Sequence, residues 1–135
     1  MEKTYILFAL MISFCLMSFA QQADLNTAKV IFYRSSRFAG GANKFIIGSS
    51  KPDTVFIKLK NGTYHEVPIN DFREWNFVGG TLKLTAEQNV KIEPGKKYYI
   101  HCFLKTAFPA DKGCFELVDE QTALKEMKSM SVCDK

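Results

Sequence analysis

The stretch Val90–Leu104 constrains the fold of this chain more than any other part of the sequence. It reads VKIEPGKKYYIHCFL, a short β-forming run followed by a Pro94–Gly95 turn and a longer β-forming run. Proline followed by glycine at the centre of a turn is typical of type II. From Tyr98 to Leu104 both faces of the expected strand are largely apolar. This indicates a strand that is covered on both sides or lies centrally in its sheet.

Short runs of β-branched and aromatic residues recur along the whole chain, with Gly, Pro and Asn turn signals between them. The first covers residues 28–34 and the last covers residues 114–118. About seven strands at such short spacing are typical of an all-β protein. The sequence therefore predicts one antiparallel β-sandwich domain over residues 28–135.

The clearest turn signal is Asn61–Gly62, which separates the alternating run of residues 54–60 from residues 63–67. Asn-Gly favours a type I′ hairpin turn, in which both central residues have positive φ. We therefore expect these two strands to pair with each other, with Leu59 opposite Tyr64.

The region after this turn gives weaker signals. Pro68 is expected to end a strand or to confine it to a sheet edge. The segment INDFREWNFVGG over residues 69–80 is expected to be irregular. Leu82 and Leu84 are expected to point inward from a short strand over residues 81–85.

A helix is expected near the C-terminal end of the domain, at about residues 119–129. Asp119 is a favourable N-cap. Ala123, Leu124 and Met127 then repeat at helical spacing and form one apolar stripe. A helix of this length is not stable alone in water, so it is expected to dock on the sheet through that stripe.

Residues 1–20 have the pattern of a secretory signal peptide, with a lysine, an apolar run and a small-residue cleavage site before Gln21. The apolar run is shorter than the roughly 20 residues that span a bilayer, so a membrane anchor is disfavoured. A lipoprotein signal at Cys15 is disfavoured by the large Phe14 before it. Residues 21–27 are expected to form a flexible leader.

The net charge of the protein is +4, which serves solubility and does not indicate nucleic-acid binding. No second apolar run is long enough to span a membrane. We therefore expect an exported protein, periplasmic or secreted, in a compartment that permits disulfides.

Three of the four cysteines remain after signal cleavage, namely Cys102, Cys114 and Cys133. Burial favours the strand register that places Cys102 opposite Phe115, because a one-residue slip would turn apolar side chains outward. In that register Cys102 and Cys114 point to opposite faces and cannot bond. We therefore predict a Cys114–Cys133 disulfide, with Cys102–Cys133 and Cys102–Cys114 as open alternatives.

The inventory of catalytic groups is thin, and its only histidines are His65 and His101. Cys102 follows His101, but adjacent strand residues point to opposite faces, so the two side chains cannot act as nucleophile and base. No zinc-ligand spacing, phosphate-binding glycine loop or GxSxG motif occurs. We therefore expect no enzyme, no metal and no cofactor.

The best candidate for a binding site is the end of the first strand and the loop that follows it. Tyr33, Arg34, Arg37 and Phe38 combine two aromatic rings with two guanidinium groups. Guanidinium groups bind carboxylates and phosphates and stack on rings. Trp75 is a further candidate. The alternative is that the aromatic side chains belong to the core and the arginines are solvated.

Four motifs in this order, AKVIFYRSSRFAGG, KNGTYHEVPI, PGKKYYIHC and FELVDEQTALKEM, resemble those of the bacterial family known as domain of unknown function 2846. The resemblance covers residues 28–127. It implies an exported or lipid-anchored envelope protein with a transthyretin-like or immunoglobulin-like sandwich, and it brings no catalytic residue. The chain differs from the lipoprotein members in lacking a convincing lipidation cysteine.

Together these features predict an exported, non-enzymatic β-sandwich module that binds a protein or glycan component of the bacterial cell envelope. No nucleic-acid partner is expected. The alternatives are a small secreted enzyme inhibitor or effector, and a structural protein of the envelope.

Signal cleavage can be tested on the exported protein by intact-mass spectrometry. We expect the mass of residues 21–135, because the small-residue site ends at Ala20. The mass of the whole chain, or a lipid-bearing product that begins at Cys15, would contradict the prediction.

Overall fold

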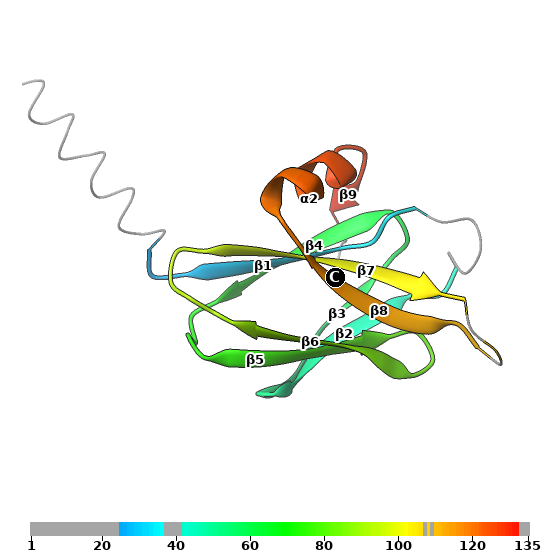
Figure 1. Cartoon of the computed structure of the whole chain (residues 1–135), viewed down its shortest axis with the longest axis horizontal. Coiled ribbons are helices and arrows are strands. Elements are labelled where there is room, and N and C mark those ends of the chain that lie inside the picture. Colours follow the sequence, from blue (N-terminus) through cyan, green and yellow to red (C-terminus); the bar gives the residue numbers. More distant parts are fainter. Residues whose placement is uncertain (1–24, 37–41, 107, 109, 133–135) are drawn as a thin grey trace, which may run out of the picture.

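The computed structural model describes residues 25–36, 42–106, 108 and 110–132, except for the side chains of residues 53, 55 and 56. In this part of the chain, nine strands and one short helix form a sandwich of two sheets (Figure 1). The elements are β1 (Ala28–Tyr33), β2 (Phe45–Lys51), β3 (Asp53–Leu59), β4 (Thr63–Ile69), β5 (Glu74–Gly80), β6 (Leu84–Lys91), β7 (Lys97–Lys105), β8 (Lys112–Val118), α2 (Glu120–Met127) and β9 (Ser131–Val132).

The two layers differ in strand direction. The order β8-β7-β1-β4-β9 makes a five-stranded mixed sheet, and the order β3-β2-β5-β6 makes a four-stranded antiparallel sheet. The predicted sandwich and C-terminal helix are confirmed. The prediction of purely antiparallel pairing is wrong, because β1 runs parallel to β7 and β4 runs parallel to β9.

Strand β1 lies at the centre of the five-stranded sheet. It pairs antiparallel with β4, where Val30 is opposite Val67, and parallel with β7, where Ile31 is beside Tyr99. Val30 packs into the core between the sheets, whereas Ile31 packs on the outer face of the sheet, the face turned away from the four-stranded sheet. Both faces of β1 are therefore buried, as expected for a strand with an almost continuous apolar run.

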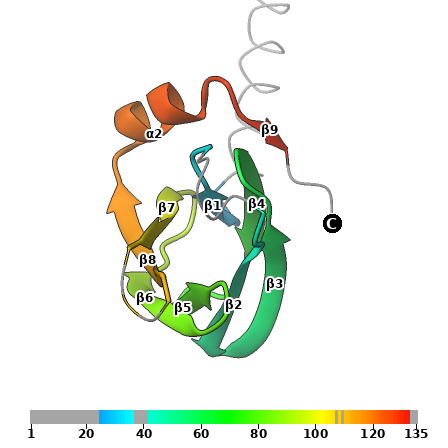
Figure 2. The same cartoon turned by 90° about the vertical axis from the view of Figure 1, so that its right-hand side faces the viewer.

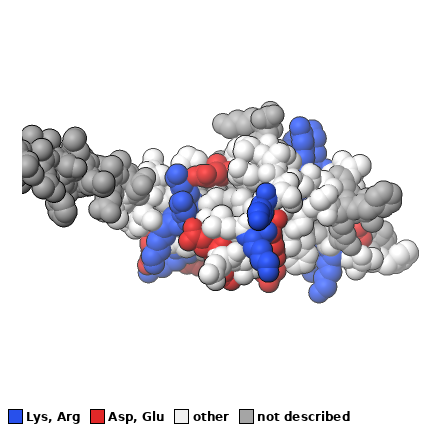
Figure 3. All heavy atoms as spheres, turned by 90° about the horizontal axis from the view of Figure 1, so that it is seen from above, with Lys and Arg blue, Asp and Glu red and all other residues white. Residues whose placement is uncertain are grey.

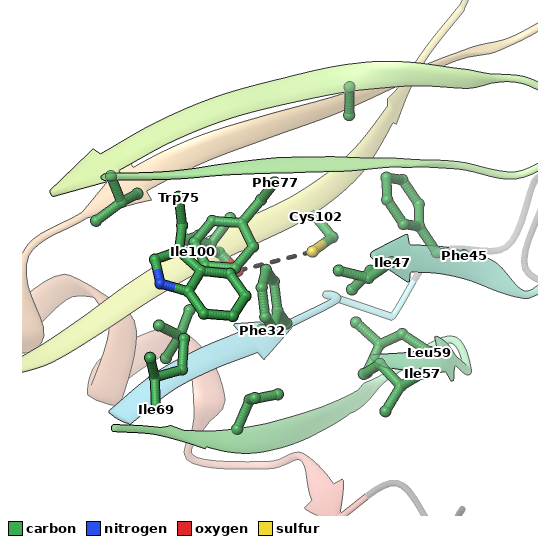
Figure 4. Packing of buried hydrophobic residues seen from close by; sticks show 14 of the residues in the cluster. Phe32, Phe45, Ile47, Ile57, Leu59, Ile69, Trp75, Phe77, Ile100 and Cys102 are labelled. Atoms are coloured by element: carbon green, nitrogen blue, oxygen red, sulfur yellow. Dashed lines mark hydrogen bonds between the residues drawn. The ribbon is translucent and has the colours of Figure 1, made fainter. Parts of the chain in front are cut away.

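The core between the sheets is dominated by aromatic rings (Figure 4). Phe32 meets Phe77 edge to face at a centroid distance of 5.3 Å, and Trp75 stacks on Phe77 at 5.8 Å. Strand β7 adds Ile100 and Cys102, both fully buried. Aromatic pairs of this kind add to the free energy of area burial, so this cluster joins the two layers firmly.

The hairpin predicted at Asn61–Gly62 is wrong. Strands β3 and β4 belong to different sheets, with Leu59 paired to Phe45 and Tyr64 paired to Tyr33. Gly62 has φ of 68°, but no described residue other than glycine has positive φ, so the turn is not type I′. The physical reason is burial, because Leu59 and Tyr64 pack into different clusters on different layers.

The Pro94–Gly95 turn also crosses between the layers, from β6 to β7. Its local geometry agrees with the type II prediction, since Gly95 has φ of 72° and the Lys96 amide donates to the Glu93 carbonyl at 3.4 Å. The strands on either side do not pair with each other, because β6 pairs with β5 and β7 pairs with β1 and β8.

Strands β5 and β6 differ most from the sequence prediction. The segment expected to be irregular contains β5, whose Trp75 and Phe77 face the core. Leu82 and Leu84 are 81% and 58% exposed, so their predicted inward direction is wrong. The register of β5 and β6 shifts between Gly79 and Gly80. This bulge lies between the buried Ala86 and Leu84, so the alternation that turns Ala86 inward does not extend to Leu84.

Helix α2 covers the outer face of the five-stranded sheet (Figure 2). The predicted N-cap is confirmed, since the Thr122 amide donates to the Asp119 carboxylate at 2.8 Å. Ala123 is fully buried in the cluster that contains Ile31 and Tyr99. None of the helices in the described residues is long and apolar enough to cross a bilayer.

The register of β7 and β8 places Cys102 opposite Phe115, as predicted, and Cys114 opposite Phe103. The described residues contain no disulfide. Cys133 lies outside them, so its predicted bond to Cys114 stays a prediction.

The Asp119 cap can be tested with the variants Asp119→Ala and Asp119→Asn. Alanine should lower the melting temperature, because the Thr122 amide loses its acceptor, whereas asparagine caps well and should lower it less.

The stabilisation of the fold by the Asp119 cap should depend on pH in a defined direction. Hydrogen bonds from Thr122 lower the pKa of Asp119 in the folded protein. The contribution of Asp119 to folding stability is therefore present above the unfolded-state pKa and is lost as the pH falls through the folded-state pKa. The difference between the wild type and Asp119→Asn should therefore shrink on acidification. A difference that is independent of pH would contradict this account.

Candidate functional site

The residues predicted as a binding site do not form a single site. Tyr33 and Arg34 are both buried at the end of β1. Arg37 and Phe38 lie outside the described residues. Trp75 belongs to the core face of the other sheet, where its Nε1 donates to the Asp71 carbonyl at 3.0 Å. Trp75 is therefore a core residue, in agreement with the alternative considered for it.

Tyr33 joins β1 to the helix. Its hydroxyl donates to the Glu126 carboxylate at 2.5 Å, and its ring stacks on the His101 imidazole at a centroid distance of 4.9 Å. Burial raises the pKa of Tyr33, and the neighbouring Glu126 carboxylate raises that pKa further. The Tyr33 phenol is therefore held in its neutral, hydrogen-donating form.

Arg34 points between the two layers and is only 2% exposed, so it is not solvated. Its Nη1 donates to the Asn43 carbonyl at 2.5 Å and approaches the Leu59 carbonyl at 3.5 Å. A buried guanidinium needs such acceptors to offset its lost hydration. Arg34 thus fastens the end of β1 to the ends of two segments of the other sheet.

A small cavity lies beside this strand end, and we call it the Ser35 cavity. Its volume is about 130 Å³. The residues that line it are Arg34, Ser35, Ser36, His101, Phe103 and Leu104.

His101 is the centre of a polar cluster at the Ser35 cavity. Its Nε2 lies 3.1 Å from the Ser35 hydroxyl, and its Nδ1 lies 3.9 Å from a carboxylate oxygen of Glu116. The Phe103 ring lies 5.2 Å from the imidazole by centroid distance. The sequence analysis missed this cluster because Ser35 and His101 are 66 positions apart and meet only through the parallel pairing of β1 and β7.

A second hollow of about 410 Å³ lies on the outer face of the four-stranded sheet, and we call it the polar groove. The residues that line it are Ser50, Lys51, Glu74, Asn76, Glu87 and Asn89. They come from three neighbouring strands, β2, β5 and β6.

Asn76 connects the polar groove through its side-chain amide. Its Nδ2 donates to Glu87 at 2.7 Å and to Asn89 at 2.6 Å, and its Oδ1 accepts from the Ser50 hydroxyl. The amide is therefore held in one orientation by three neighbours. The sequence signal was the alternation of polar Glu74 and Asn76 with aromatic Trp75 and Phe77, which the expectation of an irregular segment concealed.

The face of the molecule shown in Figure 3 does not indicate a polyanion site. Figure 3, which views the molecule from above Figure 1, shows basic and acidic side chains interspersed on that face. Within the described residues no three His, Cys, Asp or Glu side chains gather into a possible metal site.

Comparison of the chain with models of known protein families, with curated proteins and with solved structures finds no match. The resemblance to domain of unknown function 2846 therefore stays a prediction.

The role of Tyr33 can be tested with Tyr33→Phe, monitored by thermal unfolding as a function of pH. At neutral pH the variant should be less stable, because the Glu126 carboxylate loses its donor. Because folding raises the pKa of Tyr33, this residue stabilises the wild type below the unfolded-state pKa of about 10. The stabilisation is lost as the pH rises above that value, because Tyr33 ionises first in the unfolded state. The advantage of the wild type should therefore shrink above about pH 10. An unchanged difference there would contradict the account.

Proposed function

We propose that this chain is an exported binding module that holds a glycan of the cell envelope in the polar groove. The observation that carries the proposal is the hydrogen-bonded row of Ser50, Asn76 and Asn89 across three strands. Export is supported by the signal-peptide pattern of residues 1–20. The sandwich also supports the transthyretin-like or immunoglobulin-like class implied by the family resemblance, which we retain as part of the proposal.

The chemistry of the polar groove suits a ligand rich in hydroxyl groups. Amides supply both donors and acceptors, carboxylates supply acceptors, and the Lys51 ammonium supplies donors. The Lys51 and Glu74 side chains line the groove, and neither has a side-chain hydrogen bond or ion pair with another described residue. Their charged groups are therefore available to a ligand. The Asn76 amide is held in place before binding, and preorganisation of this kind lowers the entropic cost of association.

The composition of the groove favours a glycan over a protein. Protein interfaces centre on buried aromatic or aliphatic anchors, with polar groups at the rim. All six described residues that line the polar groove are polar or charged, so this part of the lining offers no apolar centre of this kind. A sugar chain instead binds through convergent hydrogen bonds on a shaped polar surface.

Binding can be measured by NMR titration of the labelled protein with a short oligosaccharide of N-acetylglucosamine, an amide-bearing sugar of cell envelopes. We expect chemical-shift changes at β2, β5 and β6. We expect Asn76→Ala to weaken binding about tenfold or more, because it removes the central amide and frees its neighbours.

The matched control is Asn26→Ala, an exposed asparagine that precedes β1 in the other sheet. It should leave the affinity unchanged. Shift changes confined to other faces, or equal affinity of Asn76→Ala and the wild type with equal melting temperatures, would refute the proposal.

A further inference from the structure

We infer that Ser35 is a nucleophile activated by His101, and that the Ser35 cavity accepts a small acyl group from an ester. This inference goes beyond the proposed glycan binding, which concerns the outer face of the other sheet. The sequence analysis considered only His101 with Cys102. The structure instead brings a serine hydroxyl to the imidazole.

The distances fit a nucleophile and its base. Nucleophile and base lie within hydrogen-bond reach in active sites of this type, and the 3.1 Å between Ser35 Oγ and His101 Nε2 is within that range. Glu116 lies 3.9 Å from Nδ1, on the opposite side of the ring. With the imidazole proton on Nδ1, facing the carboxylate, Nε2 accepts the proton of the Ser35 hydroxyl.

Three neighbouring strands hold this arrangement. His101 is paired with Glu116 of β8 on one side and with Tyr33 of β1 on the other. Ser35 follows β1 two residues after Tyr33. Stacking of Tyr33 on the imidazole fixes the plane of the ring, and the hydrogen bond from Tyr33 to Glu126 fixes Tyr33. The base is therefore oriented by the core of the fold and does not depend on a loop for its position.

The Ser35 cavity provides room for the group that would react. Its volume of about 130 Å³ equals roughly four water molecules at about 30 Å³ each, which suits an acetyl group and excludes a long acyl chain. Arg34 lines the same cavity and supplies positive charge beside it. Positive charge near the reacting carbonyl stabilises the oxyanion that forms in acyl transfer.

The reaction follows from these positions. Ser35 Oγ bonds to the acyl carbon while its proton passes to His101 Nε2. The same proton then passes to the alcohol oxygen as the ester C–O bond breaks, which leaves an acyl-serine. Water attacks that acyl carbon and gives a proton to Nε2, and the proton returns to Ser35 as the carboxylic acid leaves.

The thiol next to His101 in the sequence is unsuitable as a nucleophile. Cys102 points into the core, is fully buried and lies on the face of β7 opposite to His101. Burial also raises the pKa of its thiol, which disfavours the thiolate.

The test is covalent labelling with a small dialkyl fluorophosphate, which modifies activated serines, followed by peptide mapping. We expect the label on Ser35 and its loss in Ser35→Ala. His101→Gln should slow labelling about 100-fold, because general-base help is lost.

The variant Glu116→Gln should slow labelling several-fold without altering the fold, because this side chain is largely exposed. The control Ser129→Ala, an exposed serine after α2, should be labelled like the wild type. Hydrolysis of p-nitrophenyl acetate should exceed that of a long-chain ester and should be lost in Ser35→Ala.

The inference is overturned if the wild type is not labelled, or if the label lies on another residue. It is also overturned if His101→Gln reacts as fast as the wild type. An unchanged rate in Glu116→Gln would overturn the orienting role of Glu116. Melting temperatures of all variants separate a lost reaction from a lost fold.

Discussion

The burial of β1 on both faces is the constraint on which the rest of the structure depends. Its inner face supplies Val30 and Phe32 to the aromatic core, and its outer face supplies Ile31 and Tyr33 to the surface that α2 covers. Because β1 lies between β4 and β7, its position also fixes which strands become neighbours. Removal of this strand would open both clusters and separate the two halves of the five-stranded sheet.

The sequence predicted local structure well and strand pairing poorly. Runs of β-branched and aromatic residues located β1, β3, β7 and β8, and hydrogen-bonding chemistry located the Asp119 cap. The Asn61–Gly62 and Pro94–Gly95 signals correctly predicted turns. A turn sequence does not determine whether the strands on either side of it belong to one sheet. That outcome depends on which clusters receive the side chains, and those clusters form between residues far apart in the chain.

The candidate sites show the same limit. Tyr33 and Arg34 stood out because aromatic and guanidinium groups adjoin in the sequence, and the structure places Arg34 at the wall of the Ser35 cavity. Tyr33 stacks on His101 of β7, and Glu116 of β8 lies near His101. Only the pairing of β7 with β1 and with β8 brings these residues together. The polar groove likewise joins three strands, of which the sequence analysis expected one to be irregular.

The most direct test of this account is the protonation of the His101 imidazole, measured by long-range proton–nitrogen NMR at neutral pH or above. The pairing of β7 with β1 and with β8 places the Ser35 hydroxyl at Nε2 and the Glu116 carboxylate near Nδ1. We predict that the neutral ring carries its proton on Nδ1 and that Ser35→Ala changes the Nε2 signal. A neutral ring with its proton on Nε2, unaffected by Ser35→Ala, would contradict the account.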